Sequence, residues 1–239
     1  MSVYESRQAI LSILDVNKPV DAPTVYYALD YPADRTELAV EKDAQGRAVG
    51  FVARCRTGLD LFRPLVTMRC FAPVVAARLL AQVLAPGHSY IFFARRDQLT
   101  LIKGLMEVQN TRILHVYRLD PKRFKPAINV MVQEKAAPDG LPRFEIYSGG
   151  LQAQAGINWQ SGQFAEVFVY TEEEARRRGW GRSVITACTE QVLKAGQTPL
   201  YLVEADNEKS RQLARNVGYV DTGARQVYAD VFYTGGHEA

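Results

Sequence analysis

The residues with the clearest chemical meaning in this sequence are glycines and arginines between positions 176 and 182. The order is Arg176, two residues, Gly179, one residue and Gly181, after an apolar segment from Phe164 to Tyr170 and before a stretch with helical periodicity. Glycines let the backbone approach a ligand closely, and the first N–H groups of a helix are unpaired and lie at its positive end. This spacing predicts a pyrophosphate-binding turn. The guanidinium groups that match phosphate oxygens there belong to Arg176, Arg177, Arg178 and Arg182.

Composition favours a folded protein and argues against several classes of function. The chain has 239 residues, 47% hydrophobic and 23% charged, which suffices for one large domain or two small ones. The net charge of +3 is too small to indicate nucleic acid as a partner. The start of the chain does not resemble a signal peptide, and no apolar run reaches the roughly 18 residues of a membrane span. We therefore expect neither export nor a membrane.

The cysteines and histidines do not form a disulfide or metal-binding pattern. The three cysteines are far apart and set in apolar stretches, which is typical of buried reduced thiols. The histidines show no metal-ligand spacing. They are His88, His115 and His237, and the cysteines are Cys55, Cys70 and Cys188. These features predict a cytoplasmic location and no metal site.

Two halves of the chain show the same order of expected elements, namely strand, helix, strand, helix and strand. The first half begins with helices at 4–14 and within 18–32 and a hairpin that turns at 43–46; strands follow at 64–71, 89–94 and 111–119 and helices at 73–84 and 98–109. The second half has strands at 144–147, 152–159, 164–170, 199–204 and 227–232 and helices at 180–194 and 207–217. The repeated order predicts an α/β (α+β) fold in tandem, with a mixed, mostly antiparallel twisted sheet flanked by helices.

The boundary between the halves is expected in the proline- and glycine-containing segment 135–142, which gives domains at 1–135 and 136–239. Only the second half has the loop of glycines and arginines. In the first half the equivalent junction, Met68 to Pro73, has no glycine, and its proline lacks a helix-start N–H. We expect that half to bind no diphosphate and instead to complete the core, cover a sheet edge and form a wall of the substrate cleft.

Residues 143 to 234 resemble the GNAT superfamily of N-acetyltransferases, which transfer an acyl group from acetyl-CoA to an amine. Arg176-x-x-Gly179-x-Gly181 fits the pyrophosphate motif of that family. The segment around Glu166 is similar to the strand of histone-acetyltransferase relatives in which this glutamate is the general base. Asn207-x-x-Ser210-x-x-Leu213, closed by Gly218 and Tyr219, resembles the last helix and the turn after it. The resemblance implies a GNAT domain at 136–239 and a degenerate GNAT-like domain without a cofactor loop at 1–135.

The resemblance also implies a V-shaped opening between the strands that end at Tyr170 and Glu204, with the pantetheine of acetyl-CoA between them. Two splayed parallel strands leave N–H and C=O groups unpaired, and the amides of pantetheine can satisfy them. Residues 177 to 182, Trp180 among them, are implied to hold the pyrophosphate. The remaining residues implied to contact the cofactor are Val169, Tyr170, Thr171 and Asn207.

An amine attacks a thioester only as the neutral species, yet a lysine-type amine has a pKa of about 10.4, so a base is needed. Glu166 is the first choice, acting directly or through a water, and Glu204 is the second. A backbone N–H near Val169 or Tyr170 is expected to stabilise the oxyanion. The expected reaction is direct attack in a ternary complex by a small-molecule or peptide amine, without a covalent enzyme intermediate.

One position departs from the family. Many members have a tyrosine that protonates the departing thiolate where this chain has Ala214. Either Tyr170, Tyr201, Tyr219 or Tyr228 replaces it, or no acid is needed, because a thiol with a pKa of about 8.5 leaves as a thiolate. This departure leaves open the alternative that the chain is a non-catalytic acyl-CoA-binding or sensor protein. A nucleotide-triphosphate loop is less well supported, because Arg182 stands where such a loop has lysine and the glycine spacing is too short.

Overall fold

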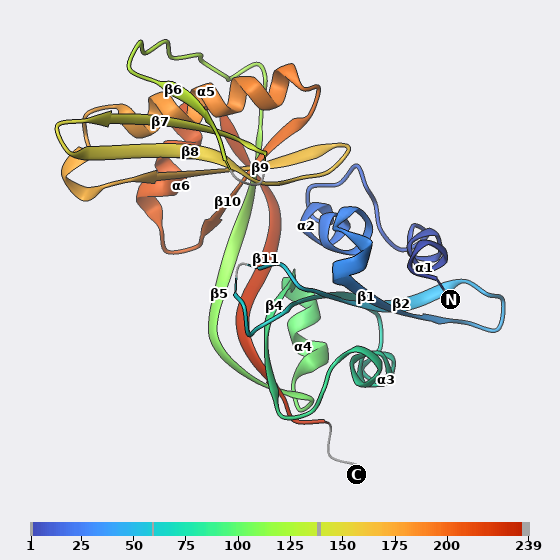
Figure 1. The fold of residues 1–239 in the computed structure, drawn as a ribbon. Helices are drawn as coiled ribbons and strands as arrows, with labels where there is room; N and C mark the ends of the chain where they lie inside the picture. Colours follow the sequence, from blue (N-terminus) through green and yellow to red (C-terminus); the bar gives the residue numbers. More distant parts are fainter. Residues whose placement is uncertain (1, 59, 138–139, 236–239) are drawn as a thin grey trace. The chain divides into compact units, whose positions relative to one another are not determined.

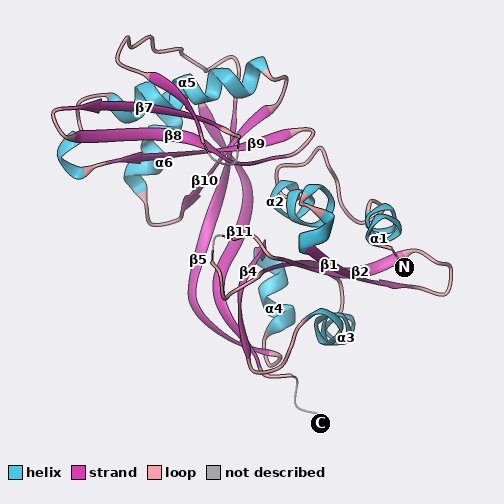
Figure 2. Ribbon diagram, viewed as in Figure 1, coloured by secondary structure: helices cyan, strands magenta, loops and turns pink. Residues whose placement is uncertain are grey.

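The computed structural model describes residues 2–58, 60–137 and 140–235, so that His237 and part of the expected linker lie outside the described residues. The chain forms two compact units (Figure 1): unit 1 comprises residues 1–114 and 225–239, and unit 2 comprises residues 115–224. Both units consist of strands and flanking helices (Figure 2), which confirms the predicted mixed, mostly antiparallel class. Among the described residues, no helix combines the length and the apolar composition that a membrane crossing requires.

Unit 1 is a mixed sheet with helices on both faces. Its elements are α1 (Val3–Ile10), α2 (Ala22–Val25), β1 (Thr36–Lys42), β2 (Ala48–Cys55), β3 (Leu65–Cys70), α3 (Pro73–Val83), β4 (His88–Arg95), α4 (Leu99–Ile102) and β5 (Met106–Leu119). Side chains alternate between the two faces of β2. Phe51 and Ala53 belong to a core cluster with Ile10 of α1, whereas Val52 belongs to a cluster with Leu79 of α3. The alternation places α1 and α3 on opposite faces of the sheet.

Unit 2 contains the elements that surround the predicted site. They are β6 (Gln133–Ala136), β7 (Pro142–Ser148), β8 (Leu151–Gln160), β9 (Phe164–Thr171), α5 (Trp180–Lys194), β10 (Thr198–Glu204), α6 (Glu208–Val217) and β11 (Tyr219–Tyr233). The strands β7, β8 and β9 pair antiparallel in sequence order, and β9 pairs parallel with β10. Helix α5 lies along this sheet (Figure 1) and buries Val184, Ile185 and Cys188 against it.

Each unit contains a strand segment from the other half of the chain. In unit 1 the strand order is β1-β2-β3-β4-β11-β5, and residues Gln226 to Tyr233 of β11 pair with β4. In unit 2 the order is β11-β5-β10-β9-β8-β7-β6, and Tyr117 and Leu119 of β5 are buried in its core. The division expected between residues 135 and 136 therefore lies within unit 2, and residues 225–239 of the second half belong to unit 1.

Two expected elements are wrong. The helix expected at 98–109 ends at Ile102, because Gly104 adopts a left-handed backbone with φ +84° and β5 begins at Met106. Of the segment expected as a linker, Lys135 and Ala136 belong to β6 and Pro142 to β7, and these two strands pair antiparallel. Its prolines and glycine predicted a break in regular structure, yet Lys135 forms an ion pair with Glu145 across the two strands.

The three cysteines are free and buried, and burial raises the pKa of each thiol to about 12. Because the thiolate is the reactive species, each thiol is roughly a thousandfold less ionised at pH 8 than a free cysteine of pKa about 8.5. We expect Cys55, Cys70 and Cys188 to react with iodoacetamide only after unfolding. Mass spectrometry of native and urea-treated protein measures this, and rapid labelling of any of them in native protein would contradict the described burial.

Candidate active site

A cavity of about 1070 Å³ lies in unit 2 where the end of β9, the loop after it and the starts of α5 and α6 meet. Of the residues expected to contact the cofactor, the following line it: Val169, Tyr170, Thr171, Arg176, Arg177, Gly179, Trp180, Gly181, Arg182 and Asn207. Arg178 is not among the lining residues, and its guanidinium lies 5.4 Å from the ring centre of Trp180. Seven further residues line the cavity that the sequence motifs did not predict as contacts: Glu173, Ala175, Glu208, Lys209, Ser210, Gln212 and Leu213. Helical spacing from Asn207 was the signal for Ser210 and Leu213, which lie on the same side of α6.

The loop before α5 has the backbone conformation of a tight turn. Gly179 is the N-cap of α5 and is left-handed, with φ +78°, and Arg177 is left-handed as well, with φ +62°. A side chain at Gly179 would meet open space, whereas a Cβ at Gly181 would stand 2.8 Å from the Oγ1 of Thr171. The two glycines therefore have different roles: Gly179 allows the turn, and Gly181 allows the helix to approach the end of β9.

The lining side chains give the cavity a positive charge. The lining contains four basic and two acidic residues: Arg176, Arg177, Arg182 and Lys209, and Glu173 and Glu208. Glu208 forms ion pairs with two arginines of α6, and Glu173 pairs with Arg176 at 3.3 Å. Within the described part of the chain, Arg177 and Arg182 have no ion-pair partner. The cavity therefore offers two uncompensated guanidinium groups to an anion.

Two helix N-termini border this cavity. In α5 the N–H of Ser183 is the first to bond within the helix, to the carbonyl of Gly179 at 3.0 Å, so the preceding amides remain available for a ligand. In α6 the Oδ1 of Asn207 accepts a hydrogen bond from the N–H of Ser210 at 3.0 Å. Asn207 is therefore a helix cap as well as a lining residue. The dipoles of both helices add to the positive potential of the cavity.

The strands β9 and β10 pair over only part of their length. Their parallel register runs from Phe164 and Thr198 to Glu166 and Leu200, and both strands continue beyond it, to Thr171 and Glu204. Val169, Tyr170 and Thr171, past the paired segment of β9, line the cavity. This arrangement leaves backbone groups of the strand ends available for an extended ligand.

Glu166 lies at the last paired position of β9, on the face of the sheet opposite to α5. Its neighbours Ala165 and Val167 belong to the core beneath α5, so alternation turns Glu166 to the other face. The register of β8 shifts between Ile157 and Trp159, and the bulge allows Asn158 to reach the Glu166 carboxylate. The Asn158 amide donates a hydrogen bond to it at 3.3 Å.

Burial raises the pKa of Glu166 to about 7, although the hydrogen bond from Asn158 acts to lower it. At neutral pH the group is therefore close to its midpoint, where it can accept and return a proton. Neither Glu166 nor Glu204 is among the residues that line the cavity. Glu204 is half-buried at the end of β10, and its carbonyl accepts a hydrogen bond from the N–H of Asn207 at 3.1 Å.

The tyrosines considered as acids lie in different places. Tyr170 is exposed and lines the cavity, and Tyr201 is buried with its hydroxyl 2.6 Å from the Oγ of Ser210, which also lines the cavity. Tyr219 is buried and bonds to Thr189 at 2.8 Å. Tyr228 belongs to unit 1, beneath the guanidinium of Arg112 at 4.4 Å. The cavity of unit 2 is therefore next to Tyr170 and Tyr201 only, among these four.

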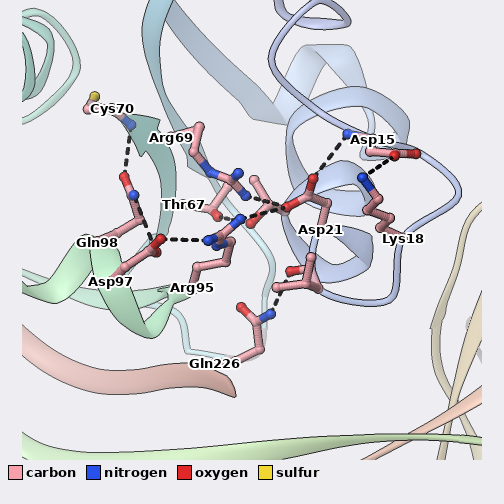
Figure 3. Close-up of polar contacts among 12 residues, drawn as sticks. Asp15, Lys18, Asp21, Thr67, Arg69, Cys70, Arg95, Asp97, Gln98 and Gln226 are labelled. Carbon is pink, nitrogen blue, oxygen red and sulfur yellow. Dashed lines mark hydrogen bonds and ion pairs between the residues drawn. The ribbon is translucent and has the colours of Figure 1, made fainter. Parts of the chain in front are cut away.

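Unit 1 has a similar pair of parallel strands, but there side chains of the protein itself bond the polar groups near the strand ends (Figure 3). β3 pairs with β4 at Leu65 and Val66 and continues to Cys70, whose N–H donates to the Oε1 of Gln98 at 2.8 Å. Arg69 and Asp21 form a buried ion pair, and Arg95 bonds Asp97 at 2.6 Å. The amide of Gln98 thus takes a backbone partner that an extended ligand would otherwise use. Pro73, in the first turn of α3, cannot donate an N–H.

Comparison with known proteins supports the resemblance drawn from the motifs. Residues 146–228 match the family model described as FR47-like protein. A GNAT-family structure from Novosphingobium aromaticivorans superposes with a TM-score of 0.62 at 16% identity, over 90% of this chain and 99% of its own. A GCN5-related N-acetyltransferase from Kribbella flavida gives 0.61 at 14%, over 91% and 96%. No curated protein matches the chain.

A tandem GNAT protein from the clavulanic acid biosynthesis pathway also superposes, with a TM-score of 0.58 at 12% identity, over 96% of this chain and 94% of its own. At sequence identities this low, structural similarity shows the fold alone. The predicted GNAT-like fold in tandem is therefore confirmed.

Proposed function

We propose that unit 2 binds acetyl-CoA and transfers its acetyl group to a primary amine of a small molecule or peptide. The observation that carries the proposal is the positively charged cavity at the start of α5, which continues to the end of β9 past its paired segment with β10. A diphosphate suits the free amides and guanidinium groups of Arg177 and Arg182, and the strand ends suit the amides of pantetheine. The residues present therefore fit coenzyme A.

In this proposal each part of the site has one task. Backbone amides of residues 177–182 hold the diphosphate, and Arg176, Arg177 and Arg182 neutralise it. Arg178 stacks on Trp180 and fixes this cavity wall. Val169, Tyr170 and Thr171 line the pantetheine, with Asn207 near its end. Unit 1 holds no second cofactor, since Gln98 already bonds the strand-end amide of Cys70 there.

The chemistry follows from the position of Glu166. Bound acetyl-CoA supplies a thioester whose carbonyl carbon accepts the amine nitrogen. Glu166, with a pKa of about 7, removes a proton from the amine, directly or through a water. A backbone N–H near Val169 or Tyr170 donates to the carbonyl oxygen as negative charge develops on it. The acetyl group passes in one ternary complex, and no side chain is acylated.

The second candidate function is a non-catalytic acyl-CoA-binding or sensor protein. The observation that favours it is Ala214, which is fully buried in the core and presents no acid to a departing thiolate. Both candidates require coenzyme A in the same cavity. They differ in turnover, so release of free thiol from acetyl-CoA across a panel of amines separates them.

Coenzyme A is expected to raise the melting temperature of the protein, and Gly179→Glu is expected to abolish that rise. At a hundred times its dissociation constant, a ligand stabilises a protein by about 2.7 kcal/mol. A glutamate at 179 has space to be accommodated and brings its side chain and negative charge to the diphosphate position. A thermal-shift assay with coenzyme A, NAD and ATP measures this, and only coenzyme A should act.

The matched control is Gly196→Glu, just after the other end of α5. Gly196 has φ +76° and open space around its Cβ, so the substitution introduces the same backbone strain and charge away from the cavity. This variant should keep the full coenzyme A response. A residual response in Gly179→Glu would place coenzyme A elsewhere, including at a second site in unit 1.

A further inference from the structure

A buried tyrosine and a cavity-lining serine form a hydrogen-bonded pair at the point where β9 and β10 separate. Tyr201 is the first residue of β10 after the last paired position, Leu200, and only 3% of its surface is exposed. Its hydroxyl lies 2.6 Å from the Oγ of Ser210 in the first turn of α6. Because Ser210 lines the cavity, a buried phenol is connected to the cavity by a single hydroxyl.

Ala214 explains why the phenol can occupy this place. It lies four residues after Ser210 and therefore on the same side of α6. Ala214, Tyr201 and Tyr219 are buried in the same core cluster, and the rings of the two tyrosines lie 5.8 Å apart. A small residue at 214 leaves room for an aromatic ring from the strand beneath, so that β10 rather than α6 supplies a phenol next to the cavity.

We propose that Ser210 donates the proton that the departing thiolate of coenzyme A needs, and that Tyr201 resupplies Ser210. The proposal rests on the proposed acetyltransferase function. As the C–S bond breaks, its electron pair stays on sulfur, the Ser210 hydroxyl proton passes to that sulfur, and the Tyr201 proton passes to Ser210. Glu166 meanwhile holds the proton from the amine, and exchange with solvent returns both groups to their starting forms. Ser210 is the catalytic residue, and Tyr201 acts through it.

The two proton-transfer groups stand on opposite faces of the sheet. Glu166 faces away from α5, whereas Tyr201 lies in the core beneath α5 and α6. A thioester between the separated strands would therefore meet the base on one face and the acid on the other. Burial raises the pKa of Tyr201, and the negative charge of Glu166 raises it further. The phenol is therefore protonated at neutral pH, before the reaction begins.

The test is a set of variants assayed for kcat with acetyl-CoA and for coenzyme A affinity. Ser210→Ala and Tyr201→Phe should each lower kcat at least about tenfold, which is less than the roughly 10²- to 10⁴-fold usual for general acids because a thiolate leaves moderately well unaided. Coenzyme A affinity should stay within about twofold. The double variant should lose no more than either single variant, because the two groups act in series. Ser210→Thr, which keeps a hydroxyl, should restore most of kcat.

The matched control is Tyr219→Phe, which removes a buried phenol hydroxyl of the same core that bonds Thr189 instead of a cavity residue. Its kcat per folded molecule should equal that of the wild type. Three results would overturn the inference but leave the proposed function intact. They are full kcat in Ser210→Ala, additive losses in the double variant, and equal losses in Tyr219→Phe and Tyr201→Phe. A wild-type protein that binds coenzyme A but acetylates no amine would overturn the proposed function, and the inference with it.

Discussion

Glu166→Gln is expected to lower kcat by about 10²- to 10⁴-fold, the range measured when a general base is removed, while coenzyme A still binds. Glutamine keeps the size of the side chain and can still bond Asn158, but it cannot accept the amine proton. The carboxylate is outside the cavity lining, so the coenzyme A-induced shift in melting temperature should be unchanged. Steady-state thiol release and a thermal-shift assay on the same sample measure both quantities.

The pH dependence of kcat follows from the same group. The active form is the carboxylate, and its pKa is about 7, so the rate should fall about tenfold per pH unit below that value and level off above it. In Glu166→Gln this acidic limb should disappear. A normal carboxylate, with a pKa of about 4.3, would place the limb nearly three units lower.

Glu204→Gln is the comparison variant, since Glu204 is the other carboxylate expected near the strand ends. If Glu166 is the base, this variant keeps both the rate and the acidic limb of the wild type. If the losses fall on Glu204→Gln and spare Glu166→Gln, the roles of the two carboxylates are reversed. Wild-type activity in both variants would mean that neither carboxylate is the base and would refute the mechanism.

A fragment of residues 136–239 is expected not to fold, whereas residues 115–224 should fold as unit 2. The fragment that starts at residue 136 lacks the segment of β5 that lies between β10 and β11. It therefore lacks Val116, Tyr117 and Leu119, each at most 2% exposed. Each such side chain contributes about 1.5–3 kcal/mol by burial, against a total stability of about 5–15 kcal/mol. Urea unfolding followed by circular dichroism should show a cooperative transition for 115–224 only.

The first half provides the reciprocal case. Residues 1–135 lack the part of β11 that pairs with β4, and their core loses Val227, Ala229, Val231 and Tyr233. We expect this fragment to unfold without cooperativity and to bind the dye ANS through exposed apolar surface. Cooperative unfolding of both 1–135 and 136–239 would show that each half folds alone. That result would contradict the assignment of a β11 segment to unit 1 and a β5 segment to unit 2.

The sequence by itself determined the local elements and the turn of glycines and arginines before α5. Helix α5 was predicted with the bounds that it has in the structure, because a glycine start and a regular apolar face are local signals. The same holds for Arg176, Gly179 and Gly181, which lie within six residues of one another, so that their spacing predicted the turn that lines the cavity. The motif order was also enough to predict the GNAT-like fold.

Tertiary structure alone decided which strand completes which sheet. Pairing between β4 and β11 joins residues more than a hundred positions apart, and no local periodicity records such a partner. The same holds for Tyr201 and Ser210, whose hydroxyls meet only because β10 and α6 pack together, and for Glu166, whose raised pKa comes from burial. Spacing along the chain fixes what neighbouring residues can do together, whereas burial and long-range pairing depend on the assembled core.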